Sequence, residues 1–106
     1  MKILFDQGTP APLRHVLVGH TIAMAGEMSW STLSNGDLLD AAEAAFDALV
    51  TTDKNLRYQQ VIAGRRLAIL VLPTTSWPKL QRLTADITAA MDALKPGDFV
   101  ELAFKP

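Results

Sequence analysis

The chain has 106 residues, of which 49% are hydrophobic and 20% charged, and its formal net charge is −1. This composition predicts a single folded domain with one continuous core, and it argues against a disordered chain or a surface that coats nucleic acid broadly, although a local basic patch remains compatible. The absence of cysteine excludes disulfides, thiolate zinc sites and a cysteine nucleophile.

The amino-terminal segment predicts a buried strand over residues 2–5. Its apolar residues are continuous, and the turn-prone sequence Gly8-Thr9-Pro10 follows closely. Asp6 interrupts the apolar run well before it reaches the length of a signal-peptide core. The apolar run 67–73 is also much shorter than the ~20 residues that span a bilayer, and we therefore expect a soluble cytoplasmic protein.

A helix is predicted next, over residues 9–19. Thr9 can cap it, two prolines suit its opening, and Gly19 can end it. The segment 21–24 then predicts a second short strand.

The middle of the chain predicts two further helix and strand units. Ser34 opens an apolar repeat with helical spacing that continues to Phe46. Residues 46–51 predict the third strand, and 53–63 a short helix with Leu56 and Ile62 facing inward. The run 67–72 is the clearest buried strand in the chain.

The last helix has a strong sequence pattern. Ser76 can cap it, Pro96-Gly97 stops it, and apolar residues recur every three or four positions: Trp77, Leu80, Leu83, Ile87, Met91 and Leu94. Residues 99–104 predict an edge strand. Because strands alternate with helices throughout, we expect an α/β fold with a mostly parallel sheet covered on both faces.

Three aspartates, Asp6, Asp37 and Asp53, lie at predicted strand or helix boundaries. Asp6 and Asp53 each follow an apolar run, and ligands of open α/β sheets collect beyond the carboxyl ends of the strands. Carboxylate oxygens are the ligands that Mg²⁺ takes in proteins. A divalent-metal site formed by the three aspartates is therefore the leading functional hypothesis.

Each aspartate also has a purely structural interpretation. Asp6 can form a side-chain turn toward Gly8, and Asp53 can cap the helix that follows it. Asp37 stands three residues after Ser34, which is a helix-capping pattern. Capping and metal binding are compatible, because one carboxylate oxygen can accept a backbone N–H while the other faces a cation.

Three segments of the chain resemble the sequence blocks of small bacterial PIN-like proteins, a branch of the PIN-domain ribonuclease superfamily. These segments are Ile3-Leu4-Phe5-Asp6-Gln7-Gly8-Thr9-Pro10, Asn35-Gly36-Asp37-Leu38-Leu39-Asp40-Ala41-Ala42 and Leu49-Val50-Thr51-Thr52-Asp53-Lys54-Asn55-Leu56. The resemblance implies one PIN-like domain over residues 1–106, with a three-layer α/β/α fold and a mostly parallel sheet of about five strands.

The resemblance also implies an activity, namely hydrolysis of RNA phosphodiesters by a Mg²⁺- or Mn²⁺-dependent nuclease. Many members of the superfamily are toxins neutralised by a cognate antitoxin, and relatives commonly form homodimers. By position, Asp6, Asp37 and Asp53 match the catalytic and metal-binding acids, whereas Thr52 and Asn55 match auxiliary polar positions. The chain departs from the pattern at Gln7, where relatives usually carry an acid.

Candidate RNA contacts follow Asp53 in the sequence. A tyrosine lies among basic residues there, which suits phosphate binding with one stacked base: Lys54, Arg57, Tyr58, Arg65 and Arg66. Scattered surface charge is the alternative interpretation. We expect Trp30 and Trp77 to be core or interface anchors and His15 and His20 to be surface or packing residues.

Two other functions compete with the nuclease. One is a catalytically degenerate PIN-like protein that binds a protein partner. The other is a receiver-like phosphoacceptor domain, because Asp53 follows the third strand and Lys105-Pro106 follows the last one. Receivers have an acidic pair after the first strand, whereas Gln7 follows Asp6 here, and the receiver interpretation therefore ranks below the nuclease.

Overall fold

The computed structural model describes residues 1–56, 62 and 64–104. A five-stranded sheet in the order β2-β1-β3-β4-β5 runs through its centre, and every neighbouring pair of strands is parallel. The strands are β1 (Lys2–Phe5), β2 (Thr21–Met24), β3 (Ala48–Thr51), β4 (Ala68–Val71) and β5 (Phe99–Glu101). The predicted α/β class and the predicted parallel sheet are both confirmed.

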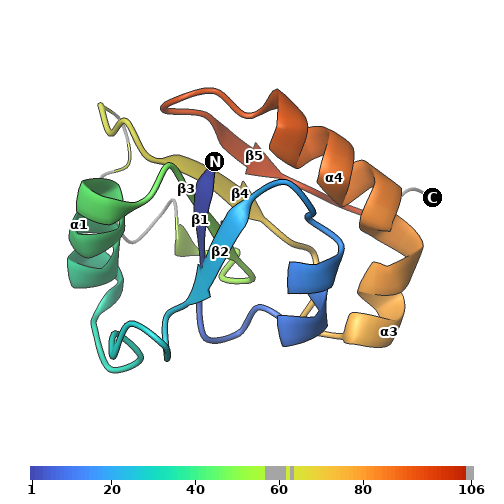
Figure 1. The fold of residues 1–106 in the computed structure, drawn as a ribbon, viewed down its shortest axis with the longest axis horizontal. Helices are drawn as coiled ribbons and strands as arrows, with labels where there is room; N and C mark the ends of the chain where they lie inside the picture. Colours follow the sequence, from blue (N-terminus) through green and yellow to red (C-terminus); the bar gives the residue numbers. More distant parts are fainter. Residues whose placement is uncertain (57–61, 63, 105–106) are drawn as a thin grey trace.

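Helices cover the two faces of the sheet and make three layers (Figure 1). The helix α1 (Asn35–Ala45) lies on one face. The other face carries the short 3-10 helix η1 (Ala11–His15) and the segments α3 (Trp77–Leu80), η2 (Gln81–Leu83) and α4 (Thr84–Ala93).

The strands separate two apolar clusters because successive side chains point to opposite faces of a sheet. In β1, Ile3 and Phe5 pack in the cluster that includes Ile87 of α4, whereas Leu4 packs in the cluster that includes Leu39 of α1. All residues of β3 and β4 are buried. Burial on both faces explains why these strands read as continuous apolar runs.

The segment after β1 differs from its prediction. Only Ala11–His15 is helical, as a 3-10 turn, and its first boundary residue is Pro10, which makes no side-chain cap. The predicted Thr9 cap is wrong, because the Thr9 hydroxyl is buried and lies 2.9 Å from the Val50 carbonyl oxygen instead. The backbone carbonyl satisfies the hydrogen-bonding requirement of this buried hydroxyl, so the hydroxyl does not cap the helix.

The predicted boundaries near α1 and in the last helix are close to the observed ones. Ser34 caps α1 and Ser76 caps α3. Each serine hydroxyl accepts a hydrogen bond from the backbone N–H three residues later. Phe46 takes up extended backbone as the last boundary residue of α1, so that β3 begins two residues later than expected. The predicted long helix is divided into α3, η2 and α4.

Most of the helix predicted over 53–63 lies outside the described residues. Leu56 is buried, and Ile62 packs against the cluster beneath α1. Within the described part of the chain, no helix is long and apolar enough to cross a membrane.

An ion pair joins η1 to the turn after β2. Arg14 Nη2 lies 2.6 Å from Glu27 Oε1, and Arg14 Nη1 lies 3.3 Å from Glu27 Oε2. The Arg14 guanidinium, helped by the backbone N–H of Met24, holds the pKa of Glu27 below its ordinary value of 4.5.

This lowered pKa makes a testable prediction for acid titration. Glu27 is expected to titrate at lower pH than an ordinary glutamate in NMR spectra, and Arg14→Met is expected to return its midpoint toward the ordinary value. Because the folded-state pKa is the lower one, the stabilisation by the pair is present above the unfolded pKa and is lost as the pH falls through the folded pKa. The effect on stability is expected to be small because both side chains are exposed. An Arg14→Met protein with an unchanged Glu27 midpoint would contradict the pairing.

Candidate functional site

The candidate site lies where the order of the strands changes direction. From β1 the chain continues to β2 on one side, and from β3 it continues to β4 and β5 on the other. Loops that leave the sheet at such a switch point diverge and leave a crevice at the carboxyl ends of the strands. Asp6 directly follows β1 and Asp53 follows β3, and the register pairs Phe5 with Val50. The structure therefore places these two aspartates at the same edge, beside the switch point.

The carboxylate of Asp6 is held by two threonines from different elements. Its Oδ2 accepts a hydrogen bond from the Thr51 hydroxyl, and its Oδ1 lies 2.7 Å from the Thr9 hydroxyl. Both threonines are almost completely buried, with 3% of Thr9 and 2% of Thr51 exposed. The orientation of Asp6 is thus determined by its partners and not by solvent.

The Thr9 hydroxyl is shared between two acceptors. The Thr9 hydroxyl lies 2.7 Å from Asp6 Oδ1 and 2.9 Å from the Val50 carbonyl oxygen, yet a hydroxyl carries a single hydrogen. Only one of the two acceptors can receive it at a time. The Val50 carbonyl oxygen also accepts the Asp6 N–H at 3.0 Å, and it therefore keeps a donor when the Thr9 hydrogen is directed at Asp6.

Asp53 is connected to Asp6 through Thr51. The Asp53 N–H donates to Thr51 Oγ1 at 3.1 Å, the same hydroxyl that donates to Asp6. Asp53 Oδ1 accepts from the Asn55 N–H at 2.9 Å, which is a side-chain turn, and Asp53 Oδ2 accepts from Asn35 Nδ2 at 3.1 Å. The loop after β3 and the first residue of α1 therefore meet at the Asp53 carboxylate, while the Asp53 N–H is bonded to Thr51 of β3.

Asp37 is not brought into this network. It is exposed in the first turn of α1, and its N–H donates to Ser34 Oγ at 3.3 Å, so the capping interpretation of this pair is confirmed. Over residues 1–56, 62 and 64–104, no three acidic or histidine side chains are grouped so that they could hold a metal ion. The neighbouring residue of the same turn that does reach the crevice is Asn35.

A small pocket of about 140 Å³ opens beside Asp6. Its polar lining consists of Asp6, Gln7, Ser31 and Asn35 with Gly8, and its apolar lining of Ala25, Trp30, Leu33 and Leu38. This volume is sufficient for roughly four water molecules at ~30 Å³ each.

Trp30 is partly buried and packs against the cluster beneath α1, as expected of an anchor residue. Its ring packs edge-on against Phe46, with centroids 6.0 Å apart and planes at 83°. Trp77 is likewise partly buried against the cluster on the other face. Trp77 is therefore a packing residue, whereas Trp30 both packs against Phe46 and lines the pocket beside Asp6.

Thr52, an auxiliary residue of the prediction, lies against the loop that carries Asp6. A Cβ atom built on Gly8 would lie 2.6 Å from Thr52 Oγ1 and 3.9 Å from Asp6 Oδ1. Glycine is therefore what lets this loop approach the end of β3 so closely.

The candidate RNA contacts are divided between the two edges of the sheet. Lys54 follows Asp53 and is exposed at the carboxyl edge, whereas Arg65 and Arg66 precede β4 and lie at the amino edge. Arg65 pairs with Asp40 at 2.9 Å and Glu43 at 3.7 Å. Arg57 and Tyr58 lie outside the described residues.

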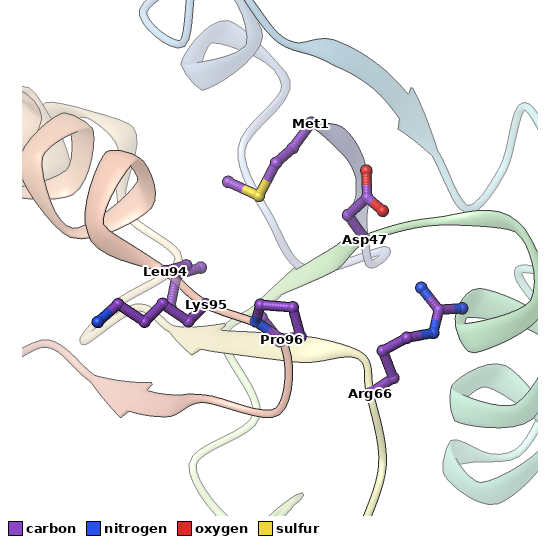
Figure 2. Close-up of a pocket in the computed structure, with 7 residues that line it drawn as sticks. Met1, Asp47, Arg66, Leu94, Lys95 and Pro96 are labelled. Carbon is purple, nitrogen blue, oxygen red and sulfur yellow. The ribbon is translucent and has the colours of Figure 1, made fainter.

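A second pocket of about 340 Å³ lies at this amino edge (Figure 2). Arg66 and Asp47 border it on one side and Leu94, Lys95 and Pro96 on the other. Asp47 already accepts a hydrogen bond from the Lys2 N–H at 2.8 Å. This pocket contains none of the predicted acids.

The two histidines have surface roles, as expected. His15 is exposed, and His20 Nε2 lies 3.2 Å from Asp92 Oδ1 at the surface of α4.

Two residues of the site, Thr9 and Thr51, were missed as site residues in the sequence interpretation. The sequence feature that indicates Thr51 is its position at the polar end of a buried strand, directly before the candidate site residues Thr52 and Asp53. For Thr9 the sequence offered a competing role as a helix cap.

Fold and site together define a small α/β protein with an all-parallel five-stranded sheet and a polar crevice at its switch point. Comparison with protein-family models, curated proteins and solved structures found no significant match to this chain.

Proposed function

We propose that this chain is a PIN-like, metal-dependent ribonuclease whose site is centred on Asp6 and Asp53. The observation that carries the proposal is the connection of these two residues at the switch point, where the Thr51 hydroxyl donates to the Asp6 carboxylate and accepts from the Asp53 N–H. The resemblance of the surrounding segments to PIN-like proteins supports the same function. By that resemblance we further propose a role as the toxin of a toxin-antitoxin pair, with RNA as substrate and an antitoxin as partner.

The donor set is sparse for a metal site. Asp6 and Asp53 would hold Mg²⁺ or Mn²⁺, and two carboxylates are compatible with Mg²⁺ only where the ion keeps several waters and takes further oxygens from substrate phosphate. When bound, such an ion lowers the pKa of a coordinated water and offsets charge that develops on the phosphoryl group.

The protein's own contribution is to orient the two carboxylates. Thr9 and Thr51 hold Asp6 from both sides, and Asn35 fixes one oxygen of Asp53. Because the threonines are buried, the geometry does not have to be reorganised when a substrate arrives.

Cleavage of a panel of RNAs with Mg²⁺ or Mn²⁺ tests this function. Asp6→Asn and Asp53→Asn are expected to lower the cleavage rate by at least about 100-fold, since each removes a charge next to the reacting phosphate. Asp37→Asn is the matched control and is expected to retain the wild-type rate within a few-fold. A wild-type protein that cleaves no RNA with either metal would contradict the proposal. An equal loss of cleavage in Asp37→Asn would mean that Asp37 belongs to the site together with Asp6 and Asp53.

Binding of Mn²⁺ provides a second measurement that does not depend on the choice of RNA. Electron paramagnetic resonance is expected to show one Mn²⁺ per wild-type chain and per Asp37→Asn chain. Asp6→Asn and Asp53→Asn are expected to bind it at least about 10-fold more weakly. Equal binding by all four proteins would place the metal elsewhere.

A protein-binding function without catalysis is the second candidate. Two observations favour it: no three-ligand group occurs among the described residues, and each carboxylate oxygen of Asp6 and Asp53 already has a protein donor within hydrogen-bond distance. Under this alternative, Asp6→Asn lowers stability but changes neither Mn²⁺ binding nor RNA cleavage, because the wild type shows none.

One observation supports the receiver-like alternative: the strand order of the sheet matches that of phosphoacceptor receivers. Incubation with acetyl phosphate followed by mass spectrometry would label Asp53 under this alternative. Under the nuclease proposal no label is expected there.

A further inference from the structure

The pocket beside Asp6 presents polar groups that the protein itself does not use. Gln7, Trp30 and Ser31 all line it. Within residues 1–56, 62 and 64–104, neither the Gln7 amide, the Ser31 hydroxyl nor the Trp30 indole N–H forms a hydrogen bond. Gln7 and Ser31 are exposed, and Trp30 is half-buried. Unpaired polar groups around a partly apolar pocket are the usual means of orienting a small ligand.

The size of the pocket limits the size of that ligand. Its volume is about 140 Å³, whereas pockets for whole small molecules measure roughly 300–1,000 Å³. An apolar cavity of about 150 Å³ holds one benzene molecule. Ala25, Leu33 and Leu38 supply apolar lining here. The pocket therefore has room for one six-membered ring of a larger ligand, and a fused bicyclic ring would project beyond it.

The pocket adjoins both aspartates of the proposed site. Asp6 lines it directly, and Asn35, which also lines it, donates to Asp53 Oδ2 at 3.1 Å. In a nucleotide only the ribose separates the base from the phosphate. A base held in this pocket therefore brings the neighbouring phosphate close to the two aspartates, where the proposed metal ion would bind it.

On the basis of the proposed nuclease function, we propose that this pocket binds the pyrimidine base next to the phosphodiester that is cleaved. The Gln7 amide supplies both a donor and an acceptor, which suits the polar edge of cytosine or uracil. Both bases also carry the O2 carbonyl, which can accept from the Trp30 N–H or the Ser31 hydroxyl. Because base edges are accessible in unpaired RNA, the substrate is single-stranded at this position. Purines have two fused rings and are selected against by size.

Titration with nucleosides tests the pocket separately from catalysis. A nucleoside carries no phosphate, so its binding requires neither the metal ion nor cleavage. Uridine and cytidine are expected to shift the Trp30 indole N–H resonance of the wild-type protein in NMR spectra, with saturation in the millimolar range. Adenosine and guanosine are expected to bind about 10-fold more weakly. The Trp77 indole, which packs on the other face of the sheet, is the internal control and is expected not to shift.

Gln7→Ala is expected to lower the affinity for uridine and cytidine about 10-fold, because one or two hydrogen bonds between neutral groups are lost. Gln81→Ala is the matched control, since Gln81 is an exposed glutamine of η2 that does not line the pocket, and its affinity is expected to equal that of the wild type. Both positions are exposed, so both variants are expected to fold, which circular dichroism verifies. Equal affinities of Gln7→Ala and the wild type would overturn the proposal, as would purine nucleosides that bind as tightly as pyrimidine nucleosides.

The alternative occupant of the pocket is a side chain of a protein partner. N-acetyl-leucine amide that shifts the Trp30 resonance at lower concentration than either pyrimidine nucleoside would overturn the proposal in favour of a peptide ligand.

RNA cleavage separates this inference from the proposed function on which it rests. Cleavage next to pyrimidines, with a preference that is lost in Gln7→Ala, supports both. Cleavage without any base preference overturns the pyrimidine pocket and leaves the nuclease function standing. Pyrimidine binding by a protein that cleaves no RNA supports the base-binding pocket and overturns the nuclease function.

Discussion

Thr51→Val is expected to lower the free energy of unfolding by about 2–4 kcal/mol. Valine has nearly the same shape as threonine, so the packing of β3 is preserved while the hydroxyl is lost. That hydroxyl donates to Asp6 Oδ2 and accepts from the Asp53 N–H. With only 2% of Thr51 exposed, water cannot easily replace either hydrogen bond, and two polar groups lose a partner together. Urea unfolding measures the change.

Thr51→Ser is the control for this prediction, because serine keeps the hydroxyl and removes only a methyl group. We expect it to cost about 1 kcal/mol and to retain most of any RNA cleavage, whereas Thr51→Val should lose cleavage as well as stability. Equal stability of the two variants would mean that the hydroxyl does not hold Asp6 and Asp53 in the folded protein.

Leu70→Ala is expected to have the largest effect on stability, at about 3–5 kcal/mol. Leu70 is in the centre of β4 with no exposed surface, in the cluster that α4 covers. Truncation leaves a cavity between the sheet and the helix, because neighbouring strands cannot move in to fill it. As a domain of this size is stable by about 5–15 kcal/mol in total, the variant should unfold at a markedly lower temperature and urea concentration.

Val18→Ala is the matched control for Leu70→Ala. Val18 is 80% exposed, and its truncation is expected to change the free energy of unfolding by no more than about 0.5 kcal/mol. A cost below about 1 kcal/mol for Leu70→Ala would contradict the burial of β4 at the centre of the sheet.

The sequence by itself determined the features that depend on residues close to one another in the chain. Continuous apolar runs predicted β1 and β2 with their observed bounds and β4 to within a residue at either end. Ser34 and Ser76 were identified as caps because a cap contacts a backbone N–H only three residues away. Alternation of these elements was then enough to predict the parallel α/β class.

Tertiary structure alone decided the composition of the crevice. Asp6 and Thr51 are 45 residues apart, and only the pairing of β1 with β3 brings them together. Strand pairing also explains why Thr9 contacts the Val50 carbonyl of β3 instead of capping a helix. The register of β3 and β4 places Arg65 and Arg66 at the edge of the sheet opposite Asp53. Asp37 kept its local role in the first turn of α1, and Asn35 contacts Asp53 instead. Local sequence determines which elements form, but strand order and register determine which side chains meet, because these contacts join residues that are distant in the chain.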